Sequence, residues 1–161
     1  MFLQLFDSLF KKKCSSRIAS YPKGECYDLQ EIFNVLNEKY FDSKIDLPLK
    51  WFGNKGFRPR RRIVLGSYHL EKKIIKVHRV LDKEHVPHCV VSFIVYHEML
   101  HHILPPKKIK NKRRKIHHPE FLMREKLFAE YVEAQEEIKK LLQGLWFVRK
   151  KKKGDNKPNK G

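Results

Sequence analysis

The chemistry-bearing residues of this 161-residue chain are concentrated in one short segment, His97-Glu98-Met99-Leu100-His101. Residues four apart in a helix lie one turn apart on the same face, so His97 and His101 can direct one nitrogen each at a single metal ion. Imidazole nitrogens bind zinc at about 2.0–2.1 Å. Glu98 is rotated by about 100° from His97 around the helix axis, so it can flank the metal and accept a proton from a zinc-activated water. The segment predicts a zinc-dependent hydrolase with Glu98 as its catalytic residue.

A catalytic zinc site needs a third protein ligand and one open position. The metzincin pattern requires glycine and histidine three and six residues after the second histidine, and Leu104 and Lys107 stand there instead. The next candidates are His117 and Glu120. A site of two histidines and one glutamate would use Glu120, whereas a site of three histidines would use His117, with Glu120 as an acceptor beside it. His118 follows His117 directly, so we expect these two side chains to face different ways.

The segment around the motif predicts a buried helix. Pro87 suits the first helical position, and Pro105 and Pro106 end the helix because proline cannot continue its hydrogen bonds. Between them, apolar residues cover most sides of the helix, which is typical of a helix inside a core. Two histidines and a glutamate are costly to bury there without a partner, and a metal ion would be that partner.

Hydrophobic periodicity predicts the remaining elements. We expect a helix over 28–40 with Asp28 as its N-cap, a strand over 47–52, a hairpin over 62–80, and a long last helix from Pro119 that ends at Gly144. This order predicts an α+β domain with a three-stranded sheet, and the chain length fits one domain. We divide the chain into an N-terminal segment (1–24), the domain (25–144) and a basic tail (145–161) that we expect to be disordered.

The charge predicts a polyanionic partner. Lys and Arg total 36 against 18 Asp and Glu, a formal net charge of +18, which favours nucleic acid, a ribosome or an anionic membrane as partner. The loop between the second and third candidate ligands is strongly basic, and we expect it to bind DNA or RNA through Lys107, Lys108, Lys110, Lys112, Arg113, Arg114 and Lys115. The alternative is a solvated loop without a partner.

Other features limit the cellular setting. No apolar run reaches the roughly 18–20 residues of a membrane span, and the start of the chain is apolar before it is basic, the reverse of a signal peptide. The three cysteines have no paired spacing, which favours a reducing compartment such as the cytoplasm and excludes a four-cysteine zinc ribbon. Trp51 and Phe52 could stack on bases, but their place at the end of an apolar strand favours packing in the core.

Two strings, YHEMLHH (96–102) and HHPEF (117–121), resemble the SprT/Spartan family of zinc metalloproteases. In that family H-E-x-x-H is followed, after a basic or polar loop, by an H-G-P-x-F-like signature whose histidine is the third ligand. The resemblance implies that His97, His101 and His117 bind the zinc and that Glu98 is catalytic. His118 stands where the family commonly has glycine. Residues 29–41 and 47–53 also resemble the opening helix and first strand of the family.

The resemblance covers about residues 27–143 and implies a compact zincin-like metalloprotease fold with one zinc ion. In Spartan itself it implies cleavage of proteins crosslinked to DNA. Many family members carry a C-terminal zinc ribbon, but no Cys-x-x-Cys occurs here, so the basic tail would have to act as a less specific tether. We expect a zinc metallopeptidase that acts on protein or peptide substrates, including proteins associated with nucleic acid. The alternatives are a non-catalytic nucleic-acid-binding protein with a structural zinc and a zinc hydrolase of phosphodiesters.

Overall fold

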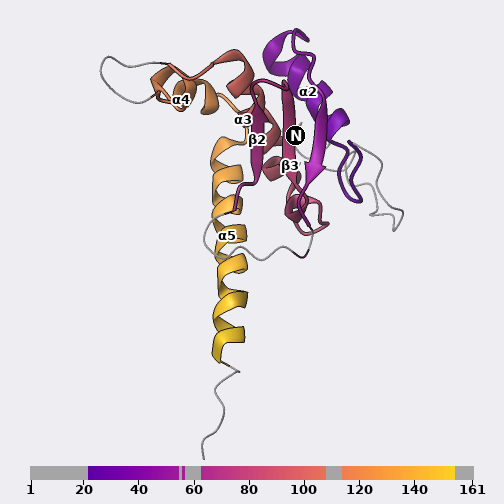
Figure 1. Cartoon of the computed structure of the whole chain (residues 1–161), viewed down its shortest axis with the longest axis vertical. Helices are drawn as coiled ribbons and strands as arrows, with labels where there is room; N and C mark the ends of the chain where they lie inside the picture. The colour runs from indigo at the N-terminus through magenta and orange to yellow at the C-terminus, as the bar shows by residue number, and fades with distance from the viewer. Residues whose placement is uncertain (1–21, 55, 57–62, 108–113, 155–161) are drawn as a thin grey trace, which may run out of the picture.

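A computed structural model describes residues 22–54, 56, 63–107 and 114–154 (Figure 1). Its elements are α2 (Leu29–Phe41), β1 (Leu49–Phe52), β2 (Gly66–His69), β3 (Ile74–His78), the short 3-10 helix η1 (Arg79–Leu81), α3 (His88–Ile103), α4 (Pro119–Glu125) and α5 (Tyr131–Gly154). The predicted α+β class is confirmed, with a three-stranded sheet, a buried helix that carries the motif and a long C-terminal helix.

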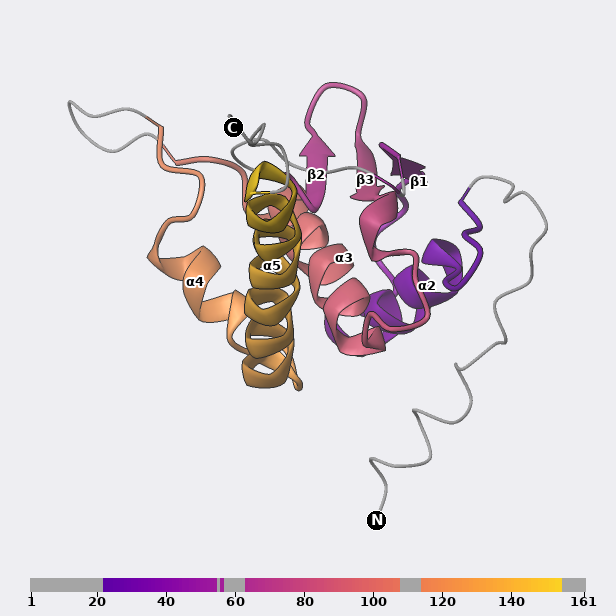
Figure 2. The same cartoon turned by 90° about the horizontal axis from the view of Figure 1, so that it is seen from below.

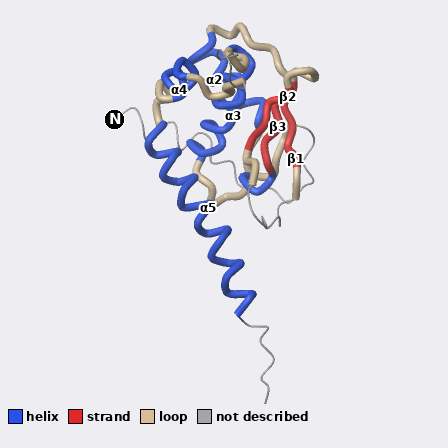
Figure 3. Tube along the Cα trace, turned by 60° about the vertical axis from the view of Figure 1, so that its left-hand side comes forward, coloured by secondary structure: helices blue, strands red, loops and turns tan. Residues whose placement is uncertain are grey.

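The sheet has the strand order β1-β3-β2. Strand β3 pairs in parallel with β1 and antiparallel with β2, with Gly66 opposite Val77 and His69 opposite Ile74. The predicted hairpin is therefore confirmed, and β1 and β2 are the two edges of the sheet that the described residues form. Figure 3 shows the strands as one layer beside the helices. Ile75 and Val77 of β3 are fully buried because they point towards these helices.

Helix α3 is the centre of the fold, because α2, α4, α5, β2 and β3 all contact it. Figure 2 shows it between α5 and α2, below the sheet. Val90, Val91, Val95 and Met99 have no exposed surface, as the all-round apolar pattern predicts. Trp51 of β1 is also buried, which agrees with packing in the core rather than stacking on bases.

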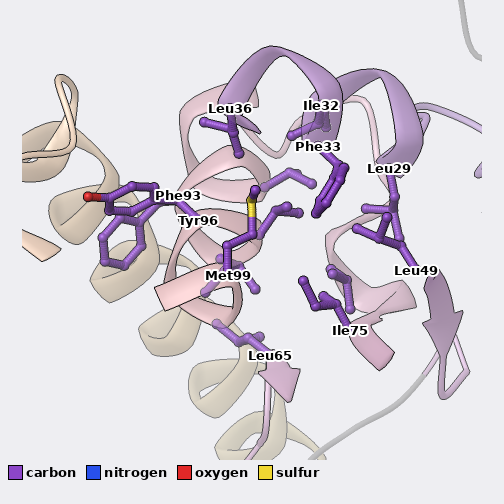
Figure 4. Packing of buried hydrophobic residues seen from close by; sticks show 14 of the residues in the cluster. Leu29, Ile32, Phe33, Leu36, Leu49, Leu65, Ile75, Phe93, Tyr96 and Met99 are labelled. Atoms are coloured by element: carbon purple, nitrogen blue, oxygen red, sulfur yellow. The ribbon is translucent and has the colours of Figure 1, made fainter. Parts of the chain in front are cut away.

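Helix α2 packs its apolar side chains against α3 and the sheet (Figure 4). Its predicted N-cap, Asp28, accepts a hydrogen bond from the backbone N of Gln30 at 2.9 Å. After the helix ends, the buried side chain of Asn37 holds the return loop: its Nδ2 donates to the Ile45 carbonyl at 2.7 Å, and its Oδ1 accepts from the Ile45 N at 3.1 Å. These bonds bring the chain back to β1.

The predicted single helix from Pro119 is wrong, because the chain forms α4 and α5 with a break over 126–130. The break turns Phe128 into the core, where its ring lies 5.3 Å from that of Tyr96 and 5.6 Å from that of Phe93. Burial of this ring stabilises the break. The predicted end at Gly144 is also wrong, since α5 runs on to Gly154; glycine costs an exposed helix only about 1 kcal/mol.

The segment before α2 is fixed to the domain by Asp82, which is fully buried. Its carboxylate accepts hydrogen bonds from the backbone N of Glu25, Cys26 and Tyr27 at 2.8, 2.9 and 3.2 Å. Residues 1–21 and 155–161 lie outside the described part, so the boundaries of the N-terminal segment and the tail stay predictions. None of the described helices is long and apolar enough to cross a membrane.

The cysteines differ in state. Cys89 is a buried free thiol, whereas Cys26 is disulfide-bonded. Disulfides are rare in reducing compartments such as the cytoplasm. The disulfide at Cys26 therefore does not support the predicted cytoplasmic location, which stays a prediction.

Candidate metal centre

Three imidazoles converge at one point beside α3. Helix α3 supplies His97 and His101, and His117 comes from the segment just before α4. The Nε2 atoms of His97 and His101 are 3.0 Å apart, and those of His101 and His117 are 3.3 Å apart. One ligand atom of each residue lies within 4.8 Å of the others. The structure therefore brings together the three histidines that the sequence predicts to meet.

These separations fit a zinc ion. Two nitrogens at about 2.05 Å from one ion, at a tetrahedral angle, stand about 3.3 Å apart. The donor set consists of nitrogen alone, which suits zinc and other imidazole-binding transition metals and does not suit calcium or magnesium. A neutral imidazole has one nitrogen without hydrogen, and in that tautomer each of the three Nε2 atoms has a lone pair that can bind a shared metal ion.

Glu125, which sequence reasoning missed, orients the first ligand. Its Oε1 lies 2.7 Å from Nδ1 of His97, and both side chains are largely buried. A carboxylate accepts, so Nδ1 carries the hydrogen and Nε2 keeps its lone pair for the centre. The available signal was the spacing, since Glu125 is one helical turn after Phe121 and thus on the same face of α4.

Phe121 forms the floor of the centre. It is fully buried, and its ring centroid lies 5.1, 4.6 and 4.8 Å from those of His97, His101 and His117. The ring is stacked on His101, with an angle of 28° between the planes. This apolar surface excludes water from below and limits how the three imidazoles can turn.

Glu120, the alternative third ligand, and His118, the neighbour of His117, do not join the group. Glu120 pairs with Lys107, its Oε2 lying 2.5 Å from Nζ, and this ammonium lowers the pKa of the Glu120 carboxyl. His118 is 2% exposed and caps α4, with its Nδ1 accepting from the backbone N of Phe121 at 3.4 Å. Its Nε2 has no hydrogen-bond partner among the described residues. The geometry therefore favours a site of three histidines over a site of two histidines and Glu120.

Burial favours the neutral form of His101 and His117. It lowers the pKa of His101 to about 3, with further lowering by His97 and His117. Burial also lowers the pKa of His117, and the nearby His97 lowers it further. Neutral imidazoles at neutral pH have free lone pairs, which metal binding requires.

Glu98 has the opposite shift. It is 4% exposed, and burial raises its pKa to about 7, although His97 and a hydrogen bond from the backbone of Tyr68 lower it in part. Its carboxylate lies against β2, where a Cβ built on Gly66 would stand 2.7 Å from Oε1. A carboxyl group with a pKa near the working pH can both accept and release a proton.

No known family model, curated protein or solved structure matches this chain. The geometry of the site alone therefore supports its interpretation.

The base of the basic loop is closed by backbone pairing. Lys107 and Lys115 exchange two hydrogen bonds, N to O at 3.1 and 3.0 Å, and Lys107, Arg114 and Lys115 are exposed. The other four residues predicted to bind nucleic acid lie outside the described residues: Lys108, Lys110, Lys112 and Arg113. Positive charge therefore stands next to His117 at the described base of the loop.

Proposed function

We propose that this protein is a zinc-dependent metallopeptidase of the SprT-like type, with a zincin-like arrangement of its sheet and motif helix. The single observation that carries the proposal is the convergence of three Nε2 atoms from His97, His101 and His117. Among the described residues, the group offers three donors rather than the four of a closed structural site, which leaves a position for substrate.

Zinc, when bound, supplies Lewis acidity that polarises a peptide carbonyl and lowers the pKa of water. The other tasks fall to residues of this chain. Glu98 follows His97 in the same helix turn and accepts the proton of the attacking water, then passes it to the leaving amine. Its pKa of about 7 suits both halves of this task. Glu125 keeps His97 in the tautomer that presents Nε2.

Strand β2 supports a peptide as the substrate. It is an edge of the described sheet, and its residues lie next to α3 and Glu98. An extended peptide can pair with an exposed strand edge through main-chain hydrogen bonds, so it would lie alongside the metal centre. We propose this binding mode for the protein or peptide substrate.

Nucleic acid is the second partner in the proposal. The net charge of +18 and the exposed cations Lys107, Arg114 and Lys115 favour a protein substrate that is associated with DNA or RNA. The same charge favours the rival function, a non-catalytic nucleic-acid-binding protein with a structural zinc. The proposal of a cytoplasmic location depends on the cysteine pattern, and the disulfide at Cys26 counts against it.

Metal analysis combined with Glu98→Gln tests the peptidase. We expect wild type and variant to hold about one zinc ion per chain, and only the wild type to cut fluorescently labelled casein. Glu120→Gln is the matched control, because it makes the same chemical change at an exposed glutamate near the site. This control should retain both zinc and activity. Equal proteolysis by wild type and Glu98→Gln would exclude the proposed function, and zinc without any proteolysis would favour the structural alternative.

A further inference from the structure

Gly66 occupies a position where the backbone does not require glycine. Gly53 is the only described glycine with positive φ, whereas Gly66 pairs regularly with Val77 in the antiparallel hairpin. Glycine in a strand weakens it and often marks a close approach of another group. The reason for a missing side chain at Gly66 must therefore lie in the space beside it.

Two side chains of α3 fill that space. A Cβ on Gly66 would stand 2.6 Å from Cγ2 of Ile94, 2.7 Å from Oε1 of Glu98 and 3.1 Å from Cγ of Glu98. Carbon atoms in contact normally stand about 3.5–4.0 Å apart. An alanine at this position would consequently displace the carboxylate, the isoleucine or the strand.

The same strand holds the carboxylate from a second side. A backbone hydrogen bond from Tyr68 lowers the pKa of Glu98 in part, so β2 also presents a donor to the carboxylate. The side chains of residues 66 and 68 share one face of the strand because side chains alternate. The Tyr68 hydroxyl in turn lies 2.8 Å from Nδ1 of His102, which ties this end of β2 to the last turn of α3. The space left by Gly66 and the hydrogen bond from Tyr68 together fix the position of the Glu98 carboxylate.

We propose that Gly66 is a positioning residue for Glu98: its missing side chain lets β2 approach α3 closely enough to hold the carboxylate where proton transfer requires it. All three histidines contact Phe121, and His97 also contacts Glu125. The atoms nearest to a Cβ at Gly66 belong instead to Ile94 and Glu98, so we expect metal binding not to depend on this glycine. The inference rests on the proposed function, since the place of Glu98 affects turnover only in a hydrolase.

A stability cycle on the metal-free protein tests the contact directly. Gly66→Ala should lower the melting temperature by about 5 °C, because overpacking of this kind is destabilising. In a Glu98→Ala background the same substitution should cost clearly less, with only the Ile94 contact left. Gly144→Ala is the matched control: a Cβ there meets nothing within 4 Å, so its effect, a gain in helix stability, should be the same in both backgrounds. An equal loss in both backgrounds would overturn the contact. If Gly66→Ala is insoluble, recovery of soluble protein with Glu98→Ala supports it, and an equally insoluble double variant overturns it.

The zinc-loaded protein tests the positioning role. Gly66→Ala should still hold about one zinc ion per chain while kcat on labelled casein falls about 100-fold, with KM within about twofold, since a misplacement of about 1 Å is sufficient for such a loss. Loss of zinc together with activity, or an unchanged kcat, would overturn the role. If the wild type itself cuts no casein, the proposed function fails, whereas the stability cycle still reports whether Gly66 and Glu98 are in contact.

Discussion

The contact between His97 and Glu125 decides which imidazole nitrogen faces the centre. The carboxylate accepts from Nδ1 at 2.7 Å and makes His97 a stronger electron donor at Nε2. Neither residue could do this alone, because an isolated imidazole divides its proton between two nitrogens.

Removal of that carboxylate should weaken metal binding. We expect Glu125→Ala to reduce zinc affinity by about 10–100-fold, the usual effect of losing the acceptor behind a ligating histidine. Competition with a chromogenic chelator measures it. Glu38→Ala, at an exposed position of α2, a helix that carries none of the three histidines, is the control and should leave the affinity unchanged. Equal affinities for both variants would contradict the role of Glu125.

Glu98 makes the stability of the metal-free protein depend on pH. Its pKa is about 7 when folded and 4.5 ordinarily, so between these values the unfolded chain releases a proton that the folded protein retains. The stability associated with the protonated carboxyl is present below about pH 4.5 and is lost as pH rises through about 7.

Glu98→Gln removes this dependence. Relative to wild type, the variant should gain up to about 3 kcal/mol of unfolding free energy between pH 4.5 and 7. Urea unfolding in the presence of a chelator measures the difference, and the titration of His101 is common to both proteins. A difference that stays constant across this range would show that Glu98 is not buried in the manner described.

Among the elements, α4 contributes most to the centre for its length. His117 precedes it, Phe121 lies in its middle and Glu125 at its end, and the Tyr96 hydroxyl donates to the Arg124 carbonyl at 2.7 Å to hold that end against α3. This helix of two turns and the two residues before it thus supply a candidate ligand, the floor and the acceptor. Displacement of α4 would disturb all three together.

Phe121→Ala tests this dependence. We expect a loss of about 3–5 kcal/mol in unfolding free energy, as for a buried phenylalanine, together with weaker zinc binding because the imidazoles lose their floor. Leu122→Ala, in the same helix but 42% exposed, should cost about 0.5 kcal/mol and keep its zinc affinity. Denaturant unfolding of the metal-free variants and chelator competition give the two readings.

The elements also show what local patterns can predict. The spacing of His97 and His101, the apolar surroundings of α3 and the cap at Asp28 depend on neighbours in sequence, and all are observed. The break at Phe128 depends on a pocket made by Tyr96 and Phe93, which are distant in sequence. The contacts of Glu125 and Gly66 likewise join separate elements, so periodicity alone could not predict them.

For the whole molecule, the excess of positive charge predicts a salt-dependent affinity for nucleic acid. Arg114→Glu combined with Lys115→Glu should weaken binding of a labelled single-stranded oligonucleotide and reduce the slope of log K against log salt by about 1–2. Fluorescence anisotropy from low salt to about 0.3 M measures both. Lys39→Glu combined with Lys44→Glu, at two exposed positions outside the loop, is the charge-matched control. If the control and the loop variant lose the same affinity and the same salt slope, the loop is not the nucleic-acid interface.

The pairing of Lys107 with Lys115 joins this charged surface to the imidazole cluster, because His117 follows Lys115 by only two residues. Arg114 and Lys115 lie within three residues of His117, so an anion bound to them would contact the same short backbone segment that carries the third imidazole. If a bound anion raises the affinity of the three histidines for metal, then bound metal must raise the affinity for the anion by the same factor. In that case, loss of the metal would lower the affinity for the polyanion, and loss of the polyanion would lower the affinity for the metal.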